Sequence, residues 1–82
     1  MKTIKYKGKT FTSGNKVFLR GSVVGTIYEI KENKEENEVN LYLQNRWGNT
    51  LVLTLWRKKV FINSSYRGKL DHLIGDLANE LY

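Results

Sequence analysis

The chain has 82 residues, a net charge of +6 and no cysteine, so we expect one small domain without disulfides or thiolate metal sites. Val, Ile, Leu and aromatic residues are frequent and proline is absent, which argues against a disordered chain. No apolar run approaches the length of a membrane span, and the first residues lack the apolar stretch of a signal peptide. We therefore expect a single domain, residues 1–82, that is cytoplasmic and does not contact a membrane.

Basic and acidic residues are segregated along the chain. Residues 1–28 carry only basic charges, residues 29–38 hold five glutamates, and residues 39–69 again carry only basic charges. Such segregation gives a molecule one strongly positive side, which suits a polyanionic partner such as nucleic acid. A charge that serves only solubility is the alternative.

The first half of the chain predicts strands. Residues 3–11 have the pattern of a short hairpin around the turn Lys7–Lys9, with a second turn at 12–15. Residues 16–30 form a long strand-like run in which Gly21 and Gly25 indicate a bulge or a sharp bend. A bend of this kind is how a small sheet begins to coil into a barrel.

The second half continues the sheet and then changes pattern. Lys31–Glu38 is charged throughout and predicts an exposed loop, followed by alternating strands at 39–44 and 50–57 and a short last strand at 58–63. Asn63, Ser64 and Ser65 are candidate helix N-caps. After them, one apolar stripe at spacings of three and four predicts an amphipathic helix over about 65–81: Leu70, Leu73, Ile74, Leu77 and Leu81.

The expected fold is therefore α+β and mainly β. It consists of a strongly bent antiparallel sheet, or a small β-barrel, of about five strands within residues 3–62, followed by one C-terminal amphipathic helix. Because strand side chains alternate between faces, the odd positions give an aliphatic core that the helix would cover. These positions are Val17, Leu19, Val23, Ile27, Val39, Leu41, Leu43, Leu51, Leu53 and Leu55.

The even positions predict a second face on which aromatic rings lie among polar and basic side chains. Exposed rings stack on unpaired bases while Arg and Lys bind phosphates, and the predicted helix is too acidic to enter a duplex groove. The candidate nucleic-acid-binding residues are Phe18, Arg20, Tyr28, Tyr42, Arg46, Trp47, Trp56, Lys58 and Lys59.

The same aromatic residues have an ordinary structural explanation. Phe, Tyr and Trp favour strands and form cross-strand pairs, so the N-terminal hairpin or another subunit could cover this face. A bend at Gly25 could also shift the alternation and move Tyr28 to the other face.

No catalytic apparatus is recognisable, so we expect neither an enzyme nor a bound cofactor. His72 is the one histidine and lies beside Asp71, where a solvated position is expected and a zinc site is not. The glycine-containing segments lack the spacing of phosphate-binding loops.

Two resemblances accompany these patterns. Gly14–Ile30 resembles the opening of small SH3-like or OB-like barrels, although a complete OB-fold places its helix between the third and fourth strands. The segment 51–82 is similar in layout to the PC4-like single-stranded DNA-binding domains. This second resemblance implies that the sheet binds nucleic acid and that the helix forms a homodimer.

The sequence thus predicts a non-enzymatic single-stranded nucleic-acid-binding protein, with DNA favoured over RNA. The alternative is a protein-interaction module, such as a phage or mobile-element inhibitor or assembly factor, because Tyr, Trp and Arg are also enriched at protein interfaces. A small RNA-associated or ribosome-associated barrel is a third, lesser alternative.

Overall fold

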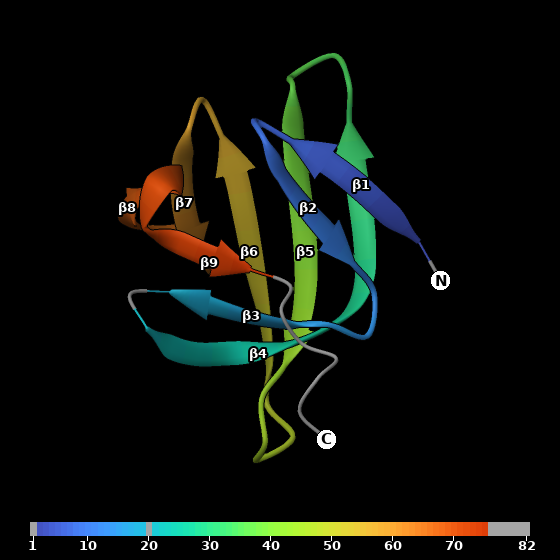
Figure 1. Cartoon of the computed structure of the whole chain (residues 1–82), viewed down its shortest axis with the longest axis vertical. Helices are drawn as coiled ribbons and strands as arrows, with labels where there is room; N and C mark the ends of the chain where they lie inside the picture. The colour runs from blue at the N-terminus through green and yellow to red at the C-terminus, as the bar shows by residue number, and fades with distance from the viewer. Residues whose placement is uncertain (1, 20, 76–82) are drawn as a thin grey trace.

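Short strands with alternating apolar residues, separated by tight turns, fill the described part of this chain (Figure 1). The structure is a computed structural model that describes residues 2–19 and 21–75. Its elements, in chain order, are β1 (Thr3–Tyr6), β2 (Lys9–Thr12), β3 (Lys16–Leu19), β4 (Ser22–Asn33), β5 (Glu38–Gln44), β6 (Thr50–Trp56), β7 (Lys59–Ile62), β8 (Ser65–Lys69), the 3-10 turn η1 (Leu70–His72) and β9 (Leu73–Gly75).

Seven of these strands form one antiparallel sheet in the order β8-β7-β6-β5-β4-β3-β9. The sheet curls so strongly that the chain passes from one edge strand, β8, to the other, β9, through η1 alone (Figure 1). The backbone N–H of Leu70 fixes this passage by donating to the Lys58 oxygen at 2.7 Å. The sheet is antiparallel and strongly bent, but the predicted fold class, α+β with about five strands and a C-terminal helix, is wrong for the described residues, which are nearly all β.

The predicted C-terminal helix is wrong for the described residues. Asn63 and Ser64 form a two-residue hairpin turn with positive φ at both positions, and residues 65–75 form β8, η1 and β9. Residues that favour N-caps also favour turns, and Gly68, at φ 145°, has a conformation that a helix does not contain. Pairing of β8 with β7 and of β9 with β3 satisfies the backbone hydrogen-bonding groups of this segment instead. The rest of the predicted helix, residues 76–81, lies outside the described residues.

The N-terminal hairpin covers the aliphatic face that the helix was expected to cover. β1 and β2 form a separate two-stranded sheet whose inner side chains, Ile4, Tyr6 and Phe11, are buried. Leu70 and Leu73 are buried as the leucine stripe predicted, but from η1 and β9. The core cluster consists of Ile4, Tyr6, Phe11, Val17, Ile27, Ile30, Val39, Leu41, Leu43, Leu53, Leu55, Val60, Leu70 and Leu73.

Two bulges interrupt the alternation on β4. At the first, the register between β3 and β4 shifts after Val17, so that Phe18 on β3 lies opposite Val23 on β4. Val23 therefore faces outward and is 53% exposed, whereas the alternation predicted it in the core. At the second, Tyr28 is the extra residue, so that both Ile27 and Ile30 reach the core.

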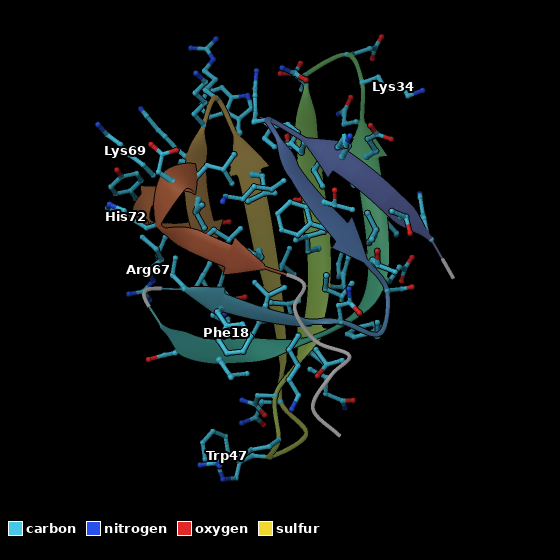
Figure 2. The ribbon with its side chains drawn as sticks, in the orientation of Figure 1. Phe18, Lys34, Trp47, Arg67, Lys69 and His72 are labelled. Carbon is cyan, nitrogen blue, oxygen red and sulfur yellow. The ribbon has the colours of Figure 1, made fainter. Side chains whose placement is uncertain are left out.

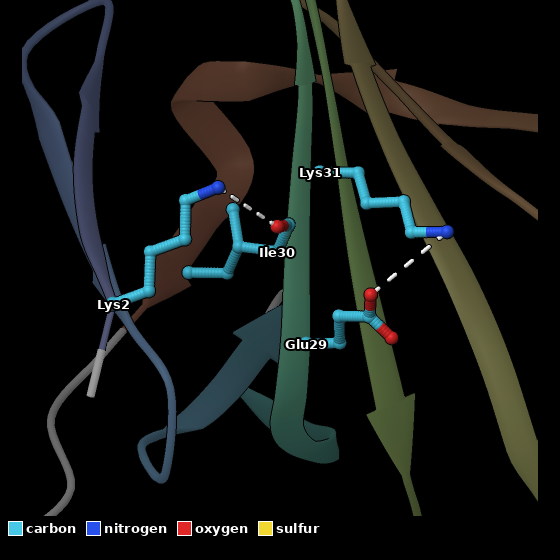
Figure 3. A network of polar contacts seen from close by, with 4 residues as sticks. All are labelled: Lys2, Glu29, Ile30 and Lys31. Carbon is cyan, nitrogen blue, oxygen red and sulfur yellow. Dashed lines mark hydrogen bonds and ion pairs between the residues drawn. The ribbon is translucent and has the colours of Figure 1, made fainter.

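The second half of β4 separates two surfaces (Figure 3). On the hairpin side, the Lys2 ammonium donates to the Ile30 backbone oxygen at 3.2 Å. On the opposite side, Lys31 and Glu29 form an exposed ion pair at 3.8 Å. The hairpin is thus fastened over the core and leaves the outer face of the sheet uncovered, contrary to the interpretation in which it covers the aromatic residues.

Candidate nucleic-acid interface

Aromatic rings on the outer face of the sheet form two groups. Cross-strand pairing places Tyr42 opposite Val52, and Thr54 opposite both Asn40 and Phe61. A hydrogen bond of 2.7 Å from the Thr54 hydroxyl to the Asn40 side-chain oxygen lies between the groups. The outer face is therefore a polar band with aromatic residues on either side of it.

The first group is a three-ring row on β6, β7 and β8. The ring centroids of Trp56 and Phe61 are 6.5 Å apart, and those of Phe61 and Tyr66 are 5.7 Å apart in an edge-to-face arrangement. Tyr66 is 55% exposed. Of these three residues, only Trp56 is a binding residue predicted from the sequence. Tyr66 lies within the predicted helix, and the sequence pattern does not indicate which face of the sheet carries Phe61.

The second group consists of Tyr28 and Tyr42, whose ring centroids are 6.3 Å apart. The bulge at Tyr28 leaves that ring on the outer face, 51% exposed. The Lys31 ammonium lies 5.4 Å from the centre of the Tyr42 ring while it also pairs with Glu29. This group therefore carries a cation that is partly neutralised.

Both tryptophans have an arginine stacked on them. The guanidinium carbon of Arg57 lies 4.5 Å from the Trp56 ring centroid, and that of Arg46 lies 4.7 Å from the Trp47 centroid. A stacked guanidinium keeps donors free at its edge, so each pair combines an aromatic surface with a phosphate-binding cation. The two pairs lie near opposite ends of the β5–β6 hairpin.

The β5–β6 turn holds Trp47 away from the body of the protein (Figure 2). Asn45 organises this turn, because its side-chain oxygen accepts the backbone N–H groups of Trp47 at 2.9 Å and of Asn49 at 3.0 Å. The Gly48 N–H closes the turn on the Asn45 backbone oxygen at 3.0 Å. Trp47 is 72% exposed, so its ring is presented to solvent by an ordered turn rather than by a loose loop.

A groove of about 620 Å³ lies between this turn and the bent first half of β4. Tyr28 and Trp47 give it aromatic walls, and Lys16 and Arg46 are its basic residues. The remaining lining residues are small, polar or aliphatic: Ser22, Val23, Val24, Gly25, Thr26, Gln44 and Asn45. None of the described acidic residues lines it.

The β6–β7 turn is strained. Arg57 and Lys58 have φ values of 52° and 63°, the left-handed conformation that a two-residue hairpin requires and that glycine or asparagine adopts most easily. Backbone hydrogen bonds from both residues reach the Tyr6 hydroxyl, which itself donates to the Asn37 oxygen at 3.1 Å. Tyr6 thus supports a turn that displays Arg57, Lys58 and Lys59, all exposed.

The two ends of the outer face differ in charge. Glu38 lies opposite Trp56 across the strand pair and accepts a hydrogen bond from the Asn40 amide at 3.3 Å, so a carboxylate neighbours the Trp56 end. At the groove end, the charged side chains among the described lining residues are Lys16 and Arg46, both basic. Phosphate is therefore better accommodated at the groove end.

The predicted site residues are distributed unevenly over this surface. Tyr28, Arg46 and Trp47 line the groove, and Tyr42 contacts Tyr28. Trp56, Lys58 and Lys59 lie at the other end. Phe18 is partly buried opposite Val23 and belongs to neither ring group among the described residues. Arg20 lies outside the described residues.

The histidine and the acidic side chains do not meet the requirements of a metal site in the described part of the chain. His72 is exposed, as predicted. Within residues 2–19 and 21–75, His, Asp and Glu side chains do not gather in a group of three that could hold a metal ion. In the same residues, no helix is long and apolar enough to cross a membrane. Searches of protein-family models, curated proteins and solved structures found no match to this chain.

Proposed function

We propose that this chain is a non-enzymatic, cytoplasmic protein that binds single-stranded nucleic acid, with DNA as its favoured ligand, through the outer face of its curled sheet. The observation that carries the proposal is the pair of stacked guanidinium groups, Arg46 on Trp47 and Arg57 on Trp56. Each places a phosphate-binding cation beside a ring on which an unpaired base can stack.

The mechanism follows from the spacing of these pairs. Six residue steps along β6 correspond to about 20 Å. One extended strand of nucleic acid can therefore contact both ends of the β5–β6 hairpin. Tyr28 and Tyr42 lie beside this path, and the three-ring row continues it across β7 and β8. Stacking on each ring contributes about 1–3 kcal/mol and tolerates any base, so binding is expected to depend little on sequence.

The proposal is tested by titrating the protein into a labelled single-stranded DNA at two salt concentrations and following fluorescence anisotropy. Binding should weaken steeply with salt, because each neutralised phosphate releases counterions. Tyr42→Ala combined with Trp56→Ala should weaken binding at least about tenfold, from the loss of stacking. Absence of binding at low salt would overturn the proposal.

Matched charge variants sharpen this test. Lys59→Gln removes a charge from the proposed interface, whereas Lys5→Gln removes an equally exposed charge from the N-terminal hairpin. Only the first should reduce the salt dependence. If the folded double aromatic variant binds like the wild type, the outer face is not the interface, and the protein-interaction alternative is favoured. Tighter binding to RNA of the same sequence would reverse the preference for DNA.

A further inference from the structure

The groove between the β5–β6 turn and the first half of β4 has the composition of a nucleotide site. Its volume of about 620 Å³ falls in the range of small-molecule sites. Aromatic side chains border it, and Gln44 and Asn45 line it with amide side chains that also hold the turn, Gln44 by donating to the Gly48 oxygen at 3.3 Å and Asn45 by accepting from the Trp47 N–H at 2.9 Å. Val23 and Val24 add aliphatic surface. A flat ring with polar edges matches this combination.

The charge of the groove favours a ligand that also carries an anionic group. Among the described residues, Lys16 and Arg46 are its only charged lining residues, and both are basic. A second, smaller hollow of about 270 Å³ beside Tyr6 gives the contrast, because Glu32 and Glu38 line it together with lysines. An anionic group would be repelled less at the first groove than at the second.

The groove is also built to stay open. A Cβ on Gly25 would lie 3.1 Å from the Gln44 backbone oxygen, a tighter contact than most Cβ atoms make, so glycine at this lining position favours the close approach of β4 to β5. Asn45 holds the opposite wall through its hydrogen bonds to the turn. Neither wall needs a ligand to order it.

We infer that this groove binds one unstacked nucleoside monophosphate unit, with its base between Tyr28 and Trp47 and its phosphate at Arg46 and Lys16. The inference rests on the proposed function and deepens it, because it makes the groove the place where one nucleotide of the strand is held individually. A free mononucleotide has the same chemistry, so it serves as the minimal ligand.

The two tryptophans allow each end of the interface to be observed separately. In Trp56→Phe, Trp47 is the only tryptophan, and its emission should be quenched saturably by deoxyadenosine monophosphate as the base stacks on it. In Trp47→Phe, the emission of Trp56 should respond to a single-stranded oligonucleotide but not to the mononucleotide. Deoxyadenosine, without phosphate, should bind the groove about tenfold more weakly.

Arg46→Gln should weaken mononucleotide binding about tenfold, whereas Lys5→Gln, on the N-terminal hairpin, should leave it unchanged. Two results would overturn the inference while the proposed function survives. In the first, the oligonucleotide quenches Trp56 but the mononucleotide fails to quench Trp47. In the second, the oligonucleotide quenches Trp56 and the mononucleotide quenches both tryptophans alike. If the oligonucleotide quenches neither tryptophan, both the inference and the proposed function fail.

Discussion

The hydroxyl of Tyr6, on the N-terminal hairpin, donates a hydrogen bond of 3.1 Å to the backbone oxygen of Asn37 in the β4–β5 turn. The backbone of the β6–β7 turn bonds to the same hydroxyl. One buried tyrosine therefore joins three turns that are far apart in the sequence. This arrangement connects the stability of the fold to the position of the basic turn at the Trp56 end of the interface.

Removing that hydroxyl should destabilise the protein. Tyr6→Phe keeps the buried ring but leaves the Asn37 oxygen and the turn N–H groups without their partner, which should lower the free energy of unfolding by about 1–2 kcal/mol. Tyr66→Phe, on an exposed ring, is the matched control and should change it by less than about 0.5 kcal/mol. Urea denaturation measures both, and equal effects would contradict the role assigned to Tyr6.

The same residue should make stability depend on pH in alkaline solution. Burial, the largest cause, raises the pKa of Tyr6 above its ordinary value of 10.0, and the charge of Glu38 adds to this. The unfolded chain then loses the proton before the folded one does, so stability is intact below about pH 10 and falls above it. Comparing unfolding at about pH 8 and pH 11 should show a smaller decline in Tyr6→Phe than in the wild type. Parallel declines would refute this.

The strained turn should respond to residue shape independently of charge. Lys58→Gly relieves the left-handed conformation and should raise the free energy of unfolding by about 0.5 kcal/mol, whereas Lys58→Val should lower it by about 1–2 kcal/mol. Both variants remove the same charge, so both should weaken oligonucleotide binding equally. A valine variant as stable as the glycine variant would show that the turn is not left-handed.

A side chain at position 25 should be destabilising. In Gly25→Ala the new methyl group would lie 3.1 Å from the Leu43 Cβ and from the Gln44 oxygen, and the closely packed strands should lose about 1–3 kcal/mol of stability. Ser22→Ala, in an exposed position of the same strand, should be nearly neutral. Thermal unfolding of the two variants tests this, and an unchanged melting temperature in Gly25→Ala would be inconsistent with the close approach of β4 and β5.

The C-terminal strand should contribute to the core. Leu73 is fully buried on β9, so Leu73→Ala should cost about 2–5 kcal/mol. Val23→Ala, at a position where the simple alternation predicts burial and the structure shows exposure, should cost less than about 0.5 kcal/mol. Reversed magnitudes would restore the alternation-based assignment of Val23.

The sequence by itself determined the parts of this protein that depend on local patterns. Alternation located β5 and β6 and assigned Leu41, Leu43, Leu53 and Leu55 to the core, because each side chain faces opposite to its neighbours. The Lys7–Lys9 turn was predicted for the same kind of reason. The charged segment 31–38 was predicted to be a loop throughout, but β4 continues to Asn33 and β5 begins at Glu38, so that only residues 34–37 form the turn. The same alternation placed Tyr42 and Tyr28 on the outer face, although a bend at Gly25 left the face of Tyr28 open.

The tertiary structure decided what depends on pairing between distant segments. Residues 65–75 have a helical leucine spacing, yet the edges of β7 and β3 offer backbone hydrogen bonds that a strand can use. Leu70 and Leu73 reach the core in the strand arrangement as they would from a helix. The bulge opposite Phe18 reverses the face of Val23, which no count along one strand reveals. The groove likewise exists only because β4 bends toward the β5–β6 turn, bringing Lys16 and Tyr28 to the same site as Arg46 and Trp47.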